Sequence, residues 1–193
     1  NKNKLIPIKT SLINSNTLQN FKSQKFYSLK PEMVGETVNN KIKRLIKILK
    51  KDRSDHLFIT APENVAWLLN IRGRDNPFSP IPNCRVLINT KGEISFFSNI
   101  KKSSNILKKK EDLIKISFFD EKEIDSFLRN LKAKKIIIDK NTCSVFFENL
   151  LNFKFKISNI SDPLYLMKSI KNKVEIKNTI KSHIHDGVAV TKF

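Results

Sequence analysis

The chain has 193 residues, 39% of them hydrophobic, and a formal net charge of +19. That length is enough for one domain with a sound core and an additional segment. No apolar run approaches the ~18 residues of a membrane span, and the first residues do not resemble a secretory signal. We therefore expect a soluble, cytoplasmic protein that has no membrane partner.

The positive charge comes from lysines spread along the whole chain. Only six of the 37 basic residues are Arg, although recognition of bases and phosphates favours the arginine fork. Lys, Asn and Ile are abundant together, as codon bias in an AT-rich genome would produce. We do not expect nucleic acid as a partner, and a basic nucleic-acid-binding protein is kept as the weaker alternative.

The first elements are a polar stretch, a helix, a strand and a second helix. Residues 1–33 are polar and aperiodic, which is typical of a linker or the tail of a preceding domain. Residues 34–52 carry apolar residues at helical spacing, and the lysines of this helix, Lys41 among them, are expected on its solvated face. The strand over residues 56–60 leads into a helix that ends near Asn70, with Thr60 and Glu63 as its capping box.

The remaining elements alternate in a way that indicates an α/β domain. Residues 83–89 and 93–98 flank Thr90-Lys91-Gly92 and predict a hairpin, in which Gly92 takes a positive φ. The elements expected after it are a helix at 103–110, a strand at 114–119, a helix after the cap Asp120, a strand at 135–139, a helix at 142–151, a strand at 153–157 and a helix at 163–169. The hairpin gives antiparallel pairing and the crossovers give parallel pairing, so we expect a mixed sheet flanked by helices.

The last segment, residues 164–193, has a different character. Asn172 and Glu175 form a capping box for a helix whose apolar residues fall on one face, at Ile176, Ile180, Ile184 and Val188. No Gly ends this helix before Phe193. We expect it to be the truncated first helix of another domain.

Candidate catalytic and metal-binding side chains do not converge. His183 and His185 would point about 200° apart on a helix, so we do not expect them to share a metal. His56 stands alone at the start of a strand, and Asp139 follows a buried strand, where helix capping is the expected role. We therefore assign no catalytic residue and no metal ligand to this chain.

The two cysteines, Cys84 and Cys143, lie 59 positions apart, in segments expected to be buried. No CxxC motif or second pair suggests a metal site. We expect free buried thiols in a reducing compartment.

Two stretches resemble one family. Residues 66–83 read AWLLNIRGRDNPFSPIPN, which is similar to the signature of the middle domain of three-domain Xaa-Pro aminopeptidases (aminopeptidase P), A-W-L-x-N-x-R-G-x-D-x-x-x-x-P-V. Asn76 and Ser79 depart from the usual residues of that signature. Residues 162–193 resemble the entry into the family's catalytic domain at Lys168, Lys171, Asn172, Glu175, His183, Ile184, Asp186, Gly187, Val188 and Ala189.

The resemblance implies a creatinase/prolidase N-terminal-like α/β domain of ribonuclease-H-like topology at residues 34–163. Residues 164–193 would then open a truncated pita-bread catalytic domain. The family removes an N-terminal residue that precedes proline and uses two metal ions, usually manganese, held by two Asp, one His and two Glu. All these ligands would lie beyond Phe193, so this chain would hold no cofactor itself.

The resemblance also gives roles to residues of the signature. Trp67, Asn70, Gly73 and Pro80 are expected to be structural, with Gly73 allowing an unusual backbone turn and the prolines stiffening the loop. Arg72 and Asp75 would then be held towards the cleft of the catalytic domain, as an interdomain or substrate-binding loop. The alternative is that these two residues pair with each other or with carbonyls of the loop.

The resulting interpretation is a non-catalytic portion of an Xaa-Pro aminopeptidase-like protein, inactive alone. Its partners would be the missing catalytic domain or a full-length homologue, and peptides with Pro at position two only in the completed enzyme. A stand-alone interaction or dimerisation module, which includes a homodimer, is the alternative.

Overall fold

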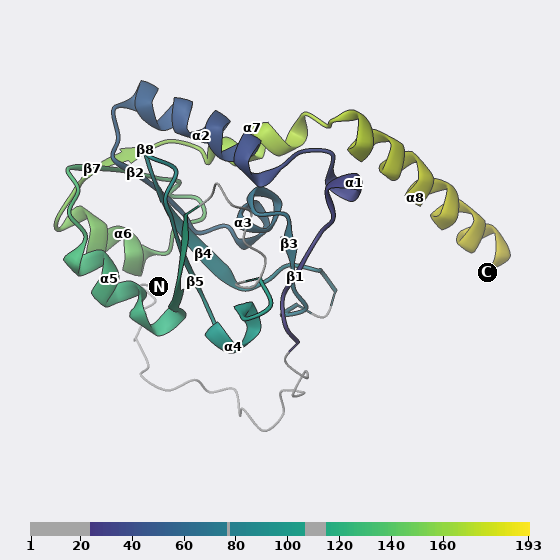
Figure 1. Ribbon diagram of the computed structural model, residues 1–193, viewed down its shortest axis with the longest axis horizontal. Coiled ribbons are helices and arrows are strands. Elements are labelled where there is room, and N and C mark those ends of the chain that lie inside the picture. The colour runs from purple at the N-terminus through teal and green to yellow at the C-terminus, as the bar shows by residue number, and fades with distance from the viewer. Residues whose placement is uncertain (1–23, 77, 107–114) are drawn as a thin grey trace, which may run out of the picture.

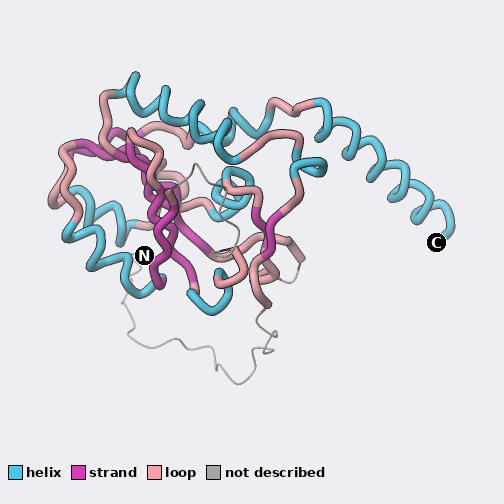
Figure 2. The backbone as a smooth tube through the Cα atoms, viewed as in Figure 1, coloured by secondary structure: helices cyan, strands magenta, loops and turns pink. Residues whose placement is uncertain are grey.

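The computed structural model describes residues 24–76, 78–106 and 115–193, which form a sheet covered by helices on both faces (Figure 1). The tube in Figure 2 shows the strands crossing the centre of this body. In spatial order the strands are β6 (Ile116–Asp120), β5 (Ile94–Ser98), β4 (Cys84–Asn89), β2 (His56–Ile59), β7 (Lys135–Ile138) and β8 (Lys156–Asn159). The predicted α/β class is confirmed.

The sheet is mixed, as expected. Strand β4 runs antiparallel to β2 and β5, whereas the pairs β5–β6, β2–β7 and β7–β8 are parallel. The apolar stretches of β2 and β7 are buried because helices cover both faces of these central strands. The edge strand β8 is more exposed.

One face of the sheet packs against α2 (Val38–Asp52), α3 (Pro62–Leu68) and α7 (Pro163–Ser169). Helix α2 buries Val38, Ile42, Leu45 and Leu49 at helical spacing, and Thr37 caps its first turn. The single helix predicted over 34–52 is wrong at its start. A short helix α1 (Pro31–Val34) precedes α2, and the two are separated at Gly35, whose φ of 71° is left-handed.

The other face packs against α5 (Ile124–Asn130) and α6 (Val145–Asn152) through aromatic side chains. The ring of Phe97 lies 5.5 Å from that of Phe119 and 5.1 Å from that of Phe127, centroid to centroid. Asp120 caps this region as predicted, at the 3₁₀ turn Glu121–Glu123 that precedes α5. This face is therefore closed by apolar burial.

The hairpin of β4 and β5 is confirmed, and Gly92 has a φ of 83°. The prediction that Thr60 and Glu63 form a capping box is wrong. Helix α3 begins after Ala61 without a side-chain cap, and the Thr60 hydroxyl lies 3.2 Å from that of Thr142. Pro62 opens the helix with a fixed φ and no N–H, so this end has one fewer donor to satisfy.

Residues 24–34 pack onto the body. Phe26 is fully buried in the core, and β1 (Tyr27–Ser28) pairs antiparallel with β3 (Ile71–Arg72) in a second, two-stranded sheet. Residues 1–23 of the predicted linker lie outside the described residues, as does part of the helix predicted at 103–110, where the structure has α4 (Ile100–Ser103). The domain boundaries after residues 33 and 163 stay predictions.

Helix α8 (Lys173–Lys192) leaves the body and extends away from it (Figure 1). Its first part contacts α1, but none of its residues is buried. No helix within the described ranges is long and apolar enough to cross a bilayer.

Candidate functional site

The signature begins on α3 and continues into a tight reversal at Asn70. Asn70 has a φ of 52°, and after it the chain enters β3. Asn tolerates the left-handed region better than most residues because its short side chain can hydrogen-bond locally. The unusual backbone expected at Gly73 is therefore found at Asn70.

Gly73 has a different role, because its φ is not left-handed. A Cβ built on Gly73 would lie 2.7 Å from the Cα of Pro82 and 3.0 Å from Cδ1 of Phe26. The Gly73 N–H also donates to the carbonyl of Pro80 at 3.2 Å. Gly73 thus permits a close approach between two arms of the signature loop, residues 70–83.

The structure does not bring Arg72 and Asp75 together. The Arg72 guanidinium donates from Nη1 to the carbonyls of Ile71 (2.8 Å) and Ala66 (3.3 Å). Burial lowers its pKa from the ordinary value, although Tyr27 acts in the opposite direction. The binding of Arg72 to nearby carbonyls is therefore observed, and the pairing of Arg72 with Asp75 is not.

Asp75 closes the loop on the opposite side. Its carboxylate pairs with Lys102 and accepts from the N–H of Asn83 at 2.6 Å. Residues far apart in sequence are therefore tied by one carboxylate, which holds the loop against α4. The role of Arg72 and Asp75 toward a partner or substrate stays a prediction.

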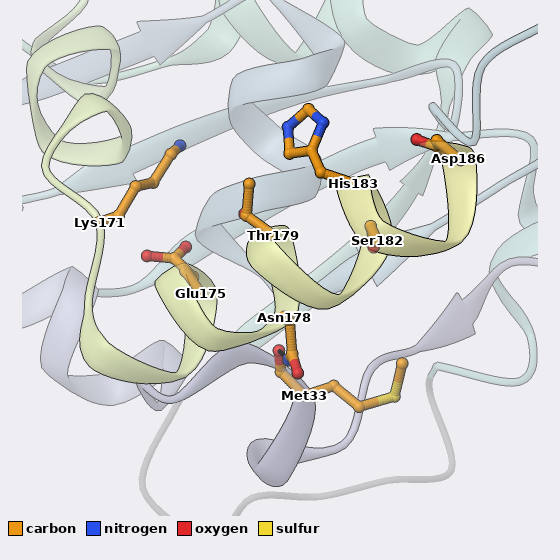
Figure 3. Close-up of a pocket in the computed structure, with 8 residues that line it drawn as sticks. All are labelled: Met33, Lys171, Glu175, Asn178, Thr179, Ser182, His183 and Asp186. Carbon is orange, nitrogen blue, oxygen red and sulfur yellow. Dashed lines mark hydrogen bonds between the residues drawn. The ribbon is translucent and has the colours of Figure 1, made fainter. Parts of the chain in front are cut away.

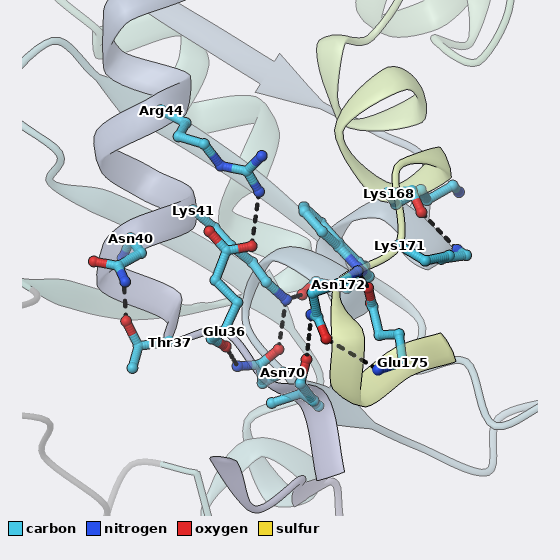
Figure 4. A network of polar contacts seen from close by, with 12 residues as sticks. Glu36, Thr37, Asn40, Lys41, Arg44, Asn70, Lys168, Lys171, Asn172 and Glu175 are labelled. Atoms are coloured by element: carbon cyan, nitrogen blue, oxygen red, sulfur yellow. Dashed lines mark hydrogen bonds and ion pairs between the residues drawn. The ribbon is translucent and has the colours of Figure 1, made fainter. Parts of the chain in front are cut away.

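The signature is joined to the rest of the domain by a lysine that sequence reasoning placed in solvent. Lys41 is only 1% exposed. Its Nζ donates to the carbonyl of Trp67 and to Oδ1 of Asn70, both at 2.7 Å, and lies 3.9 Å from the centroid of the Trp67 ring (Figure 4). The position of Lys41 in the helix could have indicated its burial. Lys41 lies three residues after Val38 and four before Leu45, on the apolar stripe of the helix.

Two further contacts extend this cluster to the turn before α2. Asn70 donates from Nδ2 to the carbonyl of Glu36 at 2.9 Å. The side chain of Glu36 in turn pairs with Arg44 at 2.7 Å. The polar groups around Lys41 thus have hydrogen-bond or ion-pair partners. A buried polar group without a partner would be costly in the low dielectric of the protein interior.

The start of α8 is fixed to the same cluster. The capping box predicted for Asn172 and Glu175 is confirmed. Asn172 also donates from Nδ2 to the carbonyl of Val34 at 2.8 Å, and Oε1 of Glu175 accepts from the indole Nε1 of Trp67 at 3.3 Å. We call Glu36, Lys41, Trp67, Asn70, Asn172 and Glu175 the α8 anchor.

Gly35 makes room for the α8 anchor. A Cβ on Gly35 would collide with the side-chain oxygen of Asn172 and would lie 2.7 Å from Cβ of Val174. The left-handed φ of Gly35 also disfavours any other residue there. The α1–α2 turn and the first turn of α8 are therefore fitted to each other.

A second buried polar group ties α3 to α7. Asn64 is fully buried, donates to Asp162 at 2.7 Å and accepts from Lys168 at 2.5 Å. Burial raises the pKa of Asp162. Asp139 accepts from the N–H of Asp162 at 2.8 Å, so it holds the chain after β8, and the predicted helix-capping role is wrong.

The polar side of α8 lines an open groove of about 320 Å³ beside α1 (Figure 3). Its lining includes Met33, Glu175, Asn178, His183 and Asp186, and Asn178 donates to the carbonyl of Met33 at 3.1 Å. Four apolar residues recur along one face of α8 and are between 48% and 60% exposed: Ile176, Ile180, Ile184 and Val188. We call these four residues the α8 stripe.

The described residues do not fit a metal pair. No three His, Cys, Asp or Glu side chains gather in residues 24–76, 78–106 and 115–193 in a way that could hold an ion. The manganese ions that the resemblance implies therefore have no donor set in this part of the chain. His56 is half-buried, and burial lowers its pKa despite the nearby Asp55.

The two cysteines are free and buried, as predicted. Burial raises the pKa of Cys84, and it raises the pKa of Cys143 to about 11. Both thiols are therefore poor nucleophiles at neutral pH.

Residues 18–175 match the family model of the creatinase/prolidase N-terminal domain. Xaa-Pro aminopeptidase 1 of Dictyostelium discoideum is 28% identical over 188 residues, which cover 96% of this chain and 29% of that relative. Xaa-Pro aminopeptidase ApepP of Drosophila melanogaster is 30% identical over 175 residues, which cover 89% of this chain and 28% of that relative. The chain thus spans less than a third of these curated relatives.

A solved structure has a similar fold. The X-prolyl aminopeptidase from Caenorhabditis elegans, a cytosolic enzyme with a di-nuclear active site, superposes with a TM-score of 0.79. It is 21% identical, and the match covers 88% of this chain and 29% of that one. At 21% identity, this structural similarity is evidence for the fold alone.

Proposed function

The chain belongs to the creatinase/prolidase N-terminal domain family, and from that premise we propose that it is the non-catalytic portion of an Xaa-Pro aminopeptidase. In this role it is a scaffold that holds a catalytic domain by the first helix of that domain, α8. The activity, removal of an N-terminal residue before proline, would belong to the completed enzyme.

The observation that carries this proposal is the contrast between the two ends of α8. Its first turn is bound by the α8 anchor, through Asn172 and Glu175. The rest of the helix buries no residue and leaves the α8 stripe exposed. Helices in proteins gain most of their stability from packing an apolar face, so a partner over the stripe would complete the structure.

The stripe is too small to form a whole interface by itself. Four side chains are far fewer than the roughly 20–30 residues that each side of a standard interface contributes. A catalytic domain that also contacts the signature loop or the groove beside α1 would supply the rest. A homodimer through α8 is the alternative, and the mass of the chain in light scattering decides between them.

The two manganese ions would be bound by the catalytic domain, since the described residues here offer no donor set. A metal pair supplies the hydroxide nucleophile at neutral pH. We therefore expect the purified chain to leave an Arg-Pro-Pro peptide uncleaved with manganese present. A cytoplasmic location, as in the C. elegans enzyme, is part of the proposal.

A chimera tests the scaffold role. Residues 24–193 would replace the matching segment of the Drosophila relative, and cleavage of Arg-Pro-Pro would be measured with manganese. We expect the chimera to be active, and to lose activity when Ile180 and Ile184 are both changed to Glu, since the stripe could no longer be buried. Lys177→Gln with Lys181→Gln is the matched charge control, because it lowers the net charge by the same amount as the two Ile→Glu changes. An active double-Ile variant would contradict the proposal.

The signature loop provides a separate prediction. In the active chimera, Arg72→Ala should raise KM or lower kcat while thermal stability is kept, because we propose that the loop shapes the mouth of the cleft. Unchanged kinetics would leave Arg72 as a residue that only binds the carbonyls of Ala66 and Ile71.

A further inference from the structure

We propose that Arg72 and Tyr27 form a receptor for a carboxylate group that the completed enzyme supplies. The carboxylate belongs either to an acidic side chain of the catalytic domain or to the carboxyl terminus of a bound peptide. The inference rests on the proposed function for this source. The receptor itself is a property of this chain.

The guanidinium of Arg72 is fixed along one edge and open along the other. A guanidinium has five N–H donors in a planar fork and no acceptor. Nη1 donates to the carbonyls of Ile71 and Ala66, whereas Nε and Nη2 donate to no residue that the structure describes. The only buried side-chain nitrogen or oxygen without a partner in this part of the chain is Nδ1 of His56. The open edge of Arg72 is therefore accessible to solvent.

Tyr27 lies next to Arg72 in the two-stranded sheet. The two residues are directly paired in the antiparallel register of β1 and β3, so their side chains project from the same face of that sheet. Tyr27 is 43% exposed, and its hydroxyl bonds none of the described residues. A phenolic O–H can donate to a carboxylate. Tyr27 can thus add one hydrogen bond to those of the guanidinium.

The positive charge of Arg72 lacks a counterpart in its surroundings. The acid nearest to it in the sequence, Asp75, pairs with Lys102 instead. Lys41 and the charged side chains that act on it comprise two anions and three cations: Glu36, Glu175, Lys41, Arg44 and Arg72. One carboxylate on the open edge of Arg72 would balance this cluster, and an arginine fork matches a carboxylate with two parallel hydrogen bonds. A single negative charge favours a carboxylate over a phosphate dianion.

The receptor lies close to the start of α8. Strand β1 leads into α1, and α1 contacts α8 (Figure 1). Arg72 also acts on the charge of Lys41 in the α8 anchor. The receptor is therefore beside the helix that the proposed function assigns to the catalytic domain, where that domain or its bound peptide would approach this chain.

Binding of acetate to the full chain tests the receptor without a catalytic domain. The side-chain N–H signals of the six arginines would be followed by NMR in a ¹⁵N-labelled sample, with those of Arg72 identified by their loss in Arg72→Lys. We expect acetate to move the Nε–H signal of Arg72 further than that of Arg53, which is exposed. The shift should shrink in Tyr27→Phe. Chloride at the same concentration is the control for ionic strength.

The chimera identifies the source of the carboxylate. Cleavage of Arg-Pro-Pro would be compared with cleavage of its C-terminal amide, which has no carboxylate at that end. We expect Arg72→Gln to lower kcat/KM at least about 10-fold, as for a lost hydrogen bond to a charged group. Loss with the free acid alone identifies the carboxyl terminus of the peptide, and equal loss with both peptides identifies the catalytic domain. Arg53→Gln removes the same charge at a remote position and should keep the activity.

Three results would overturn the inference. These are an acetate shift at Arg72 no larger than that at Arg53, a shift that is unchanged in Tyr27→Phe, or an unchanged kcat/KM with both peptides in Arg72→Gln. Failure of the proposed function gives a different result, because the chimera would then be inactive before any change at Arg72. The acetate titration would still decide whether the receptor exists.

Discussion

The two faces of the sheet are held in different ways. The α5–α6 face is closed by packed phenylalanines, with Phe97 in contact with Phe119 and Phe127. The face that carries α2, α3 and α7 buries polar groups as well, among them Lys41 and Asn64. Apolar burial has no direction, whereas hydrogen bonds do. Both faces bury apolar side chains, and the second face also fixes where α8 leaves the domain.

The aromatic face should show the largest loss of stability. Phe97→Ala removes a fully buried ring, and we expect the free energy of unfolding to fall by about 3–5 kcal/mol. Phe153→Ala is the matched control, because that ring is 93% exposed and its loss should cost little. Urea denaturation followed by circular dichroism measures both. Equal losses of unfolding free energy in the two variants would contradict the claim that the buried ring of Phe97 stabilises this face.

The polar face should show a pH dependence that comes from Lys41. The pKa of Lys41 is about 8 in the folded chain and 10.5 ordinarily, so the unfolded chain binds more protons between these values. The contribution of Lys41 to stability is therefore lowest below pH 8 and rises by up to about 3 kcal/mol by pH 10.5.

Urea titrations of wild type and Lys41→Met across pH 7–10.5 measure this effect. The difference in unfolding free energy between the two proteins should change across this range, because only wild type has the rising contribution. A constant difference would show that burial of Lys41 carries no proton linkage.

Gly73 should give a smaller loss that is confined to the signature loop. In Gly73→Ala the new Cβ meets backbone and ring atoms of Pro82, so the loop must shift. We expect a loss of about 1–3 kcal/mol. Gly187→Ala is the control, because nothing lies within 4 Å of that position and Ala favours helix. Thermal melts compare them, and a neutral Gly73→Ala would refute the close-approach role.

Local patterns in the sequence were enough for most of the fold. The Gly92 hairpin and the cap of α8 by Asn172 follow from a few adjacent residues. The alternation of helices and strands also predicted the mixed sheet. These features depend on backbone geometry and on partners that lie close in sequence.

The missed features depend on contacts between distant residues. Lys41 reads as a surface lysine, and only its partners Trp67 and Asn70, 26 and 29 positions away, explain its burial. The pairing of β1 with β3 involves two residues on each side and gives no periodic signal. The sequence predicts an unusual backbone turn at Gly73 because it does not show the close approach of Pro82.

The most direct test of the account measures the direction of α8. Spin labels on Lys181→Cys and Lys122→Cys, both at exposed positions, would give the distance from α8 to the body by double electron–electron resonance. We expect one narrow distribution at pH 7, and a broad one in Asn172→Ala, which lacks the cap and the bond to Val34. A broad distribution in the protein without the Asn172 change, or an unchanged one in Asn172→Ala, would contradict the claim that the α8 anchor directs this helix.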